Sequence, residues 1–310
     1  METDLTIREL SALWITDKQQ YVKQSTHAAY ALILENHILP AFGDNRQLVE
    51  TEVQDFALSK LHNGLSRKTV KDLLIVLRMI QKYGVKIGRF PFSEWVVRYP
   101  TERENRELEV LSIDHQRRIV QYVREHFTFR NLGIYICLHT GLRIGELCGL
   151  KWSDINWTNE SICINRTVER VYYIEDGVRR TEVVVGVPKT KHSIREIPIS
   201  KDVMEMIRPW RTKVSDDFFV LSNEAKPTEP RVYRYYYSSF LKKLGIPHQK
   251  FHGLRHTFAT RCVESRCDYK TVSAILGHAN ITTTLNLYVH PNLEQKKKCI
   301  NEMMKGLWRV

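Results

Sequence analysis

The sequence predicts a mainly α-helical protein with a small antiparallel β-sheet, an α+β fold. Apolar residues recur at helical spacing through most of the first hundred residues and again after Lys201. Between Ser161 and Ile199 the pattern changes to alternating β-branched residues, which is typical of strands. At 310 residues the chain exceeds one average domain, so we expect two domains that each bury a core.

Residues 1–100 are expected to form a bundle of short helices. Thr6 followed by Glu9 is a capping-box pattern, and the apolar residues after it fall on one helix face. The residues expected on that face are Ile7, Leu10, Leu13 and Trp14. Three further helices are expected from Ser25 to a point before Pro40, over 51–63, and from a cap at Ser66 to Gly84.

The region after the bundle divides into a linker, a second domain and a tail. Residues 101–110 lie in a polar stretch that is nearly free of apolar side chains, which indicates an exposed linker. The tripeptide Glu175-Asp176-Gly177 is a turn signal between two β-branched runs, so it predicts a hairpin. Helices are expected before and after this sheet region. The expected boundaries are 1–100, 101–110, 111–291 and 292–310.

The composition favours a polyanionic partner. The chain has 47 Lys and Arg against 35 Asp and Glu, a net charge of +12, and most of the excess lies after residue 100. The six cysteines show no C-x-x-C pair and no zinc-like spacing, so neither a disulfide framework nor a metal finger is expected. There is no apolar run near the roughly 20 residues of a membrane helix and no signal-peptide pattern, which predicts a cytoplasmic protein without membrane association.

Two arginines, two histidines and a late tyrosine carry the chemistry of the second domain. They are Arg143, His252, Arg255, His278 and Tyr288. Guanidinium groups bind two phosphate oxygens at once, and a phenol can attack phosphorus covalently, so the set suits phosphodiester chemistry without a metal. Taken singly, each residue also has a structural explanation, such as an ion pair, a solvated basic stripe, a helix cap or a half-buried aromatic ring.

The sequence motifs around these residues resemble those of the tyrosine recombinases, the phage and transposon integrase family. The chain reads T-G-L-R-I-G-E-L around Arg143, H-G-L-R-H-T-F-A-T from His252, L-G-H at His278 and T-T-L-N-L-Y-V-H around Tyr288. The resemblance covers roughly residues 108–291. The region before it is similar, more loosely, to the DNA-binding core-binding domain of the family.

The resemblance implies a role for each residue. Arg143 and Arg255 would bind the non-bridging oxygens of the scissile phosphate, and Tyr288 would be the nucleophile. His252 would be an acid/base group, and His278 would hydrogen-bond the phosphate. The implied reaction forms a 3′-phosphotyrosyl link, releases a 5′-hydroxyl and needs neither ATP nor a divalent ion.

Further residues are assigned by the same resemblance. The segment P-K-T-K-H-S-I-R-E-I-P matches the family's β-hairpin lysine, so Lys189 would be the general acid, with Lys191 as second choice. Glu146 would orient the neighbouring basic side chains. His256 is expected to face a different side of its helix from Arg255, and either to pack or to support the site by contacting one of its residues.

DNA contacts are expected from Lys68 and Lys71 near the start of the fourth helix, from Lys191, and from Arg231 and Arg234. The last two belong to R-V-Y-R-Y-Y-Y, which fits a helix that contacts DNA and equally an amphipathic helix that packs its tyrosines.

The resemblance also implies partners. These are double-stranded DNA carrying attachment sites, other copies of the chain in a tetramer, and an accessory DNA-bending or excision factor as a possible addition. The tail after Tyr288 would dock either on a neighbouring subunit or on the subunit to which it belongs. Many relatives carry an N-terminal arm-binding domain that is not visible here, so the chain is a short recombinase or a truncated one. The rival functions are a type IB topoisomerase and a catalytically silent DNA-binding regulator on the same fold.

Overall fold

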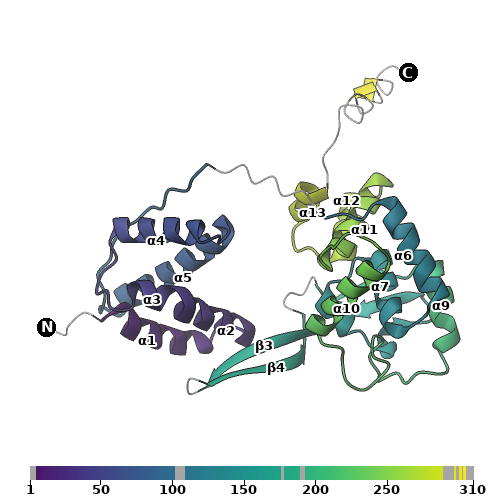
Figure 1. Ribbon diagram of the computed structural model, residues 1–310, viewed down its shortest axis with the longest axis horizontal. Coiled ribbons are helices and arrows are strands. Elements are labelled where there is room, and N and C mark those ends of the chain that lie inside the picture. The colour runs from purple at the N-terminus through teal and green to yellow at the C-terminus, as the bar shows by residue number, and fades with distance from the viewer. Residues whose placement is uncertain are drawn as a thin grey trace. The chain divides into compact units, whose positions relative to one another are not determined.

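The computed structural model describes residues 5–101, 109–175, 178–188 and 193–288, together with 297, 300, 301, 303 and 304 (Figure 1). The chain divides into two compact units, here called the N-terminal unit and the C-terminal unit. They are Met1–Asn105 with Val171–Glu182, and Arg106–Arg170 with Val183–Val310. The expected linker at 101–110 and the tail at 292–310 lie mostly outside the described residues, so those boundaries stay predictions.

The N-terminal unit is built from amphipathic helices around one apolar core. Thr6 caps the first helix through its hydroxyl, and the Glu9 carboxylate accepts the Thr6 N–H at 2.9 Å, which confirms the capping box. Ser66 caps the last long helix in the same way. The helices are α1 (Ile7–Gln19), α2 (Gln24–Ile33), α3 (Leu39–Phe42), α4 (Glu50–His62) and α5 (Arg67–Lys86), with a π-helical stretch (Leu34–Ile38) between α2 and α3.

The helical path does not stop before Pro40, so that expectation was wrong. The chain continues from α2 through the π-helical stretch into α3, and Pro40 occupies the first turn of α3. A proline is tolerated in a first turn because the N–H that it lacks would have no helical partner there. The π-helical stretch thus separates α2 from α3, so Pro40 lies at the start of a helix and not in the interior of one.

Two further expectations for the N-terminal unit also fail, for reasons of helix geometry and packing. Leu13 is 47% exposed, because its position lies away from the stripe that Ile7, Leu10 and Trp14 form at i, i+3 and i+7. Gly84 does not end α5, which runs on to Lys86. A Cβ at Gly84 would lie 2.6 Å from a side-chain atom of Leu10, so this glycine permits close packing inside the helix.

The C-terminal unit contains the remaining helices and the sheets. One apolar core joins the helix over 129–140 to the strands and to several of the later helices, and a second, smaller cluster contains Ala259, Val272, Leu276 and Tyr288. The helices are α6 (Ile113–Glu125), α7 (Phe129–Thr140), α8 (Ile144–Cys148), α9 (Lys201–Ile207), α10 (Pro230–Lys243), α11 (His252–Glu264), α12 (Tyr269–Leu276) and α13 (Ile281–Tyr288).

The β structure confirms the predicted small antiparallel sheet and hairpin. Strands β1 (Ile155–Asn156), β2 (Ser161–Ile164) and β5 (Arg195–Pro198) form one sheet in the order β1-β2-β5. Ile162 lies opposite Ile197, and both are buried, so the register directs one face into the core. Strands β3 (Thr167–Glu175) and β4 (Val178–Gly186) pair with each other, and their turn residues Asp176 and Gly177 lie outside the described residues.

Helix α7 is the central helix of the C-terminal unit and delivers the chain to the candidate site. Its residues 131–137 are all buried, which is expected of a helix that is covered on every side. The Thr128 hydroxyl caps its start, and Gly141 ends it in the left-handed conformation with φ 64°. None of the described helices is both long and apolar enough to span a bilayer.

Candidate active site

The turn after α7 brings the first arginine to the site. Gly141 can adopt its positive φ without strain, and a Cβ there would lie 2.7 Å from Phe258 and 2.8 Å from Leu276. The turn places Arg143 at the residue before α8, where its backbone N–H donates to the Glu146 carboxylate at 3.0 Å. The sequence T-G-L-R is therefore a tight connection that fixes where the arginine side chain begins.

The guanidinium of Arg143 is held between a carboxylate and the end of another helix. Its Nη1 donates to Glu146 Oε1 at 2.8 Å, and its Nη2 donates to the Gly277 carbonyl at 3.2 Å. The last carbonyls of α12 lack helical partners, and they carry the negative end of the helix dipole, so a cation is stabilised there. The side chain is 37% exposed, so it keeps access to solvent.

Arg255 reaches the same helix end from α11 and is almost fully buried. Its Nη1 donates to the Gly141 carbonyl at 3.0 Å, and its Nη2 donates to the Leu276 carbonyl at 2.8 Å. Arg143 also donates to Leu276, at 3.4 Å, so the two guanidinium groups converge on one carbonyl oxygen. Burial, and then the neighbouring Arg143, lower the pKa of Arg255 to about 9, which still leaves it protonated at neutral pH.

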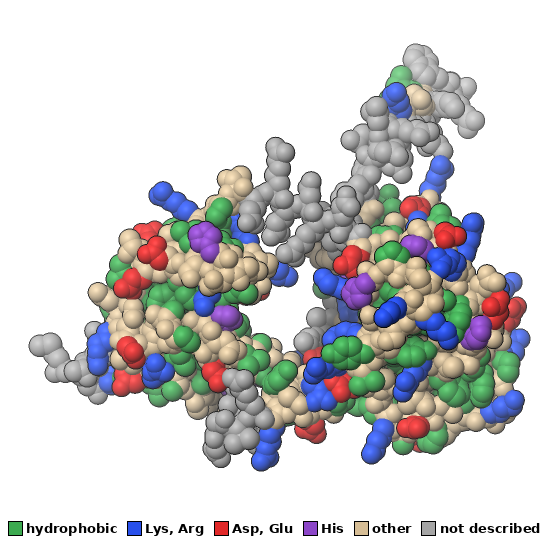
Figure 2. Space-filling view, in the orientation of Figure 1, with side chains coloured by type: hydrophobic (Ala, Val, Ile, Leu, Met, Phe, Trp, Pro, Cys, Tyr) green, Lys and Arg blue, Asp and Glu red, His purple; other side chains and the backbone are tan. Residues whose placement is uncertain are grey.

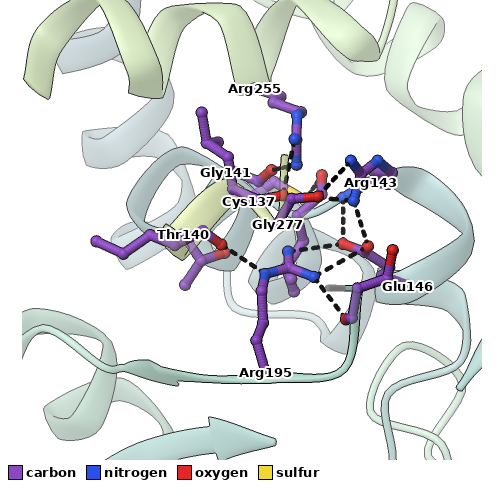
Figure 3. A network of polar contacts seen from close by, with 12 residues as sticks. Cys137, Thr140, Gly141, Arg143, Glu146, Arg195, Arg255 and Gly277 are labelled. Carbon is purple, nitrogen blue, oxygen red and sulfur yellow. Dashed lines mark hydrogen bonds and ion pairs between the residues drawn. The ribbon is translucent and has the colours of Figure 1, made fainter. Parts of the chain in front are cut away.

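A third arginine, Arg195 of β5, completes the cationic cluster and was not anticipated. Its Nη1 and Nη2 donate to the two carboxylate oxygens of Glu146 at 3.1 and 2.9 Å, and its Nε donates to the Ile275 carbonyl at 2.5 Å. Figure 3 shows the Glu146 carboxylate between the guanidinium groups of Arg143 and Arg195. Arg195 stands in the segment P-K-T-K-H-S-I-R-E-I-P, and its place in that motif is the signal in the sequence that could have identified it.

Glu146 holds this cluster together, as the orienting role expected for it requires. The carboxylate is 3% exposed. Burial alone would raise its pKa, but the hydrogen bonds and charge of Arg195, together with Arg143, hold the pKa below its ordinary value. Glu146 is therefore ionised at neutral pH. It binds the guanidinium of Arg195 in a bidentate arrangement and that of Arg143 through a single hydrogen bond.

We expect Glu146→Gln to destabilise the protein by about 3–5 kcal/mol at neutral pH, because it leaves the buried Arg195 without its counter-ion. Chemical denaturation would measure this. The depressed pKa of Glu146 means that its stabilisation exists above about pH 4.3, where an unfolded-chain glutamate is ionised, and is lost as the pH falls through the folded-state pKa. The deficit of the variant should therefore shrink in acid.

Glu160→Gln is the matched control for this change. Glu160 pairs with Arg208 at 3.1 Å in an exposed ion pair, so the same substitution should cost about 1 kcal/mol or less. If the two variants lose equal stability, the Glu146 cluster does not support the fold.

The two histidines expected at the site lie within electrostatic reach of the arginines. His252 is the first residue of α11, and although it is partly exposed, the burial of its ring lowers its pKa, as do the neighbouring His256 and Arg255. His278 follows the left-handed Gly277, and its Nδ1 lies 2.8 Å from the Thr284 hydroxyl. Burial, and then the charges of the arginines, lower the pKa of His278 to about 4.

Tyr288 is docked at the end of α13 against α11 and α12. It is 6% exposed and packs with Ala259, Val272 and Leu276. Its hydroxyl lies 2.7 Å from Nδ1 of His256. Burial raises the pKa of Tyr288, and the nearby Arg255 and Arg143 oppose that rise. The hydroxyl is thus a protonated phenol in this arrangement, beside the cationic cluster.

The contact of His256 with Tyr288 agrees with the second of the two roles expected for it, that of contacting a residue of the site. His256 lies four residues after His252, and their rings meet edge to face with centroids 4.6 Å apart. The i, i+4 spacing to His252 was the signal for a shared face. A tyrosine 32 residues further along the chain could not be placed against it from the sequence.

The other expected residues are not all brought to this cluster. Lys189 and Lys191 lie outside the described residues, so their placement stays a prediction. Lys68 and Lys71 are exposed on α5 of the N-terminal unit, and Lys71 Nζ lies 5.4 Å from the centre of the Tyr99 ring. Among the described residues there is no group of three or more His, Cys, Asp or Glu side chains placed to hold a metal ion.

Helix α10 presents an exposed basic face next to the start of α11. Arg231 and Arg234 are exposed, whereas Tyr233 and Tyr237 on the opposite side are buried in the core. The buried tyrosines pack as the second alternative expects, and the contact of Arg231 and Arg234 with DNA stays a prediction. Arg234 also lines a cavity of about 360 Å³ that has His252 on its wall.

Comparison with known proteins places this geometry in a family. Residues 109–295 match the phage integrase family, and residues 6–48 match the phage integrase N-terminal SAM-like domain. A tyrosine recombinase XerC-like protein of Caldanaerobacter subterraneus subsp. tengcongensis is 27% identical over 97% of this chain and 83% of its own. The ICEBs1 integrase of Bacillus subtilis is 24% identical over 93% of this chain and 78% of its own.

Solved structures show the same fold. A Tn1549 transposon integrase in complex with transposon right end DNA has a TM-score of 0.76 at 21% identity, covering 97% of this chain and 100% of that one. A lambda integrase dimer bound to a core site has a TM-score of 0.63 at 17% identity, covering 92% of this chain and 95% of that one. Since the family match spans more than half of the sequence, the chain belongs to the phage integrase family of tyrosine recombinases.

Proposed function

We propose that this chain is a site-specific DNA recombinase that uses Tyr288 to cut and rejoin DNA strands, integrating or excising a mobile element. The observation that carries the assignment of residues is the convergence of Arg143 and Arg255 on the Leu276 carbonyl, with Tyr288 packed on that same leucine. Two guanidinium groups fixed this closely form a site for one phosphate group. The phenol beside them is the nucleophile.

The reaction is a transesterification at phosphorus. The Tyr288 oxygen attacks the scissile phosphate, the bond to the 5′-oxygen breaks, and a 3′-phosphotyrosyl link forms. Arg143 and Arg255 stabilise the charge on the non-bridging oxygens, because their donors are already fixed by Glu146 and the helix carbonyls. His278 hydrogen-bonds the phosphate from the side of α12.

The departing 5′-oxygen needs a proton. Lys189 supplies it in this proposal, with Lys191 as the alternative. Arginines near that ammonium group would lower its pKa and so the cost of releasing the proton. His252 acts as an acid/base group at the start of α11. The 5′-hydroxyl of a partner strand later attacks the phosphotyrosine and restores the DNA backbone. Since the covalent intermediate retains the bond energy, the chemistry requires neither ATP nor a divalent ion.

Double-stranded DNA with attachment sites is the substrate that fits the charge of the chain. Figure 2 shows more Lys and Arg than Asp and Glu side chains on the drawn face of the C-terminal unit. Lys68 and Lys71 of α5, and Arg231 and Arg234 of α10, are the exposed cations that we assign to DNA, and the Tn1549 integrase was solved in complex with DNA. Such phosphate contacts make affinity fall steeply with salt.

The assembly is a tetramer on DNA in this proposal. A lambda integrase has been solved as a tetramer bound to a Holliday junction, which is a precedent within the same fold. The tail at 292–310 would link subunits, and an accessory DNA-bending or excision factor would set direction. The protein would act in the bacterial cytoplasm. No observation favours a topoisomerase or a silent regulator over this function.

A nicked suicide duplex tests the proposed function. The duplex carries the attachment site taken from the DNA that flanks the gene, and its nick lets the short fragment diffuse away after cleavage, so the covalent complex accumulates. We expect a denaturation-resistant adduct, formed also in the presence of EDTA, whose DNA-bearing peptide contains Tyr288. Failure of the wild-type protein to form any adduct on a duplex that it binds would overturn the assignment.

A further inference from the structure

The hydroxyl of Tyr288 has one hydrogen-bond partner among the described residues, and that partner is His256. The distance from Tyr288 Oη to His256 Nδ1 is 2.7 Å, and the ring centroids lie 5.7 Å apart. The two side chains come from α11 and α13, which pack directly on each other. A histidine in contact with the proposed nucleophile lies where proton transfer needs it.

The surroundings of His256 decide which group donates in this hydrogen bond. The charged and titratable groups that act on it are Arg255 and His252 on its own helix, Glu109 before α6, and Tyr288 on α13. Burial and then Arg255 lower the pKa of His256, while Glu109 opposes them. The imidazole is therefore neutral at neutral pH. Because burial keeps the phenol protonated, Tyr288 donates and the Nδ1 lone pair accepts.

We propose that His256 is the general base of the cleavage step, which removes the proton from Tyr288 as the phenol attacks phosphorus. This role rests on the proposed function of Tyr288. The Tyr288 O–H bond breaks as the O–P bond forms, and its proton passes to His256 Nδ1. The leaving 5′-oxygen takes a different proton, from the general acid. In the reverse step His256 returns its proton to the departing phenol.

His252 is less suited to this task by its placement. It begins α11, and the structure brings its ring against the His256 ring and not against the phenol. One turn of helix thus separates the two histidines, and only the second contacts the nucleophile. His252 stays available to the phosphate or to the leaving group, so the two histidines take different parts of one reaction.

Phosphate binding would strengthen His256 as a base. In the unbound protein the Arg255 cation disfavours a second positive charge on the imidazole. A phosphate bound to Arg143 and Arg255 cancels part of that charge, which makes a protonated His256 more favourable at the moment of attack. His256 therefore activates the phenol when DNA is bound, and the phenol stays protonated when DNA is absent.

His256→Asn and His256→Ala are the decisive variants. Asn places an amide oxygen near the position of Nδ1, so it keeps an acceptor for the phenol but cannot take its proton. We expect both variants to lose about 10²–10³-fold in single-turnover cleavage of the nicked duplex, with DNA affinity and melting temperature near wild type. The acid limb of the wild-type pH–rate profile, which reports loss of the neutral base, should disappear in both. His62→Asn on α4, an exposed histidine, should cleave as wild type does.

A duplex with a 5′-bridging phosphorothiolate separates the base from the acid. A thiolate leaves without protonation, so this substrate should restore cleavage to Lys189→Ala but not to His256→Asn. Wild-type cleavage rates for His256→Asn on both substrates, with the wild-type adduct mapped to Tyr288, would overturn the role of His256 and leave the proposed function intact. Recovery of His256→Asn by the phosphorothiolate would also overturn it, because His256 would then act on the leaving group.

Discussion

Tyr288→Phe is expected to abolish covalent adduct formation while leaving DNA binding unchanged. The substitution removes only the hydroxyl, and the ring keeps its contacts with Ala259, Val272 and Leu276. Loss of a catalytic nucleophile lowers the rate by about 10⁴-fold or more. Gel-shift titration with the attachment-site duplex would measure binding, and the nicked duplex would measure adduct formation after denaturation.

The matched control for this variant is Tyr21→Phe, which removes a hydroxyl from a tyrosine that is 72% exposed in the N-terminal unit. It should form the adduct at the wild-type rate. An adduct that persists in Tyr288→Phe would show that another residue attacks the phosphorus. A loss of DNA affinity in parallel with the loss of adduct would show instead that docking of Tyr288 supports the structure of the DNA-binding surface.

Much of the fold follows from local patterns in the sequence. The capping box at Thr6 and the cap at Ser66 each act within a few residues, and the structure confirms them. The path through Pro40 was missed for a physical reason. A π-helical stretch depends on how neighbouring helices pack, and no short sequence pattern predicts it.

The residues of the candidate site also differ in whether a local motif could identify them. Arg143 and Arg255 could be selected because each lies in a motif of its own, and Glu146 because the family resemblance implies an acidic residue three positions after Arg143. Arg195 and the contact of His256 with Tyr288 join segments that are 49 and 32 residues apart. Such contacts depend on how α11, α13 and β5 pack against their neighbours. The spacing of residues along the sequence does not give that information.

Arg255→Lys is expected to lower the cleavage rate by about 10²–10³-fold although it preserves the positive charge. The guanidinium donates to the Gly141 and Leu276 carbonyls through different nitrogens and still has further N–H groups for a phosphate. A lysine has a single nitrogen, which cannot bind both carbonyls and two phosphate oxygens together. Single-turnover cleavage of the nicked duplex would measure the loss.

DNA affinity should change little in Arg255→Lys, because one buried cation contributes a small part of a binding energy that many phosphate contacts share. Arg208→Lys, at an arginine that is 66% exposed, should cleave at the wild-type rate. A folded Arg255→Lys that cleaves within about threefold of wild type would show that charge alone suffices at this position. We expect the defect in catalysis and not in binding. Gly141 and the end of α12 fix the direction of the guanidinium donors, and the transition state requires that direction.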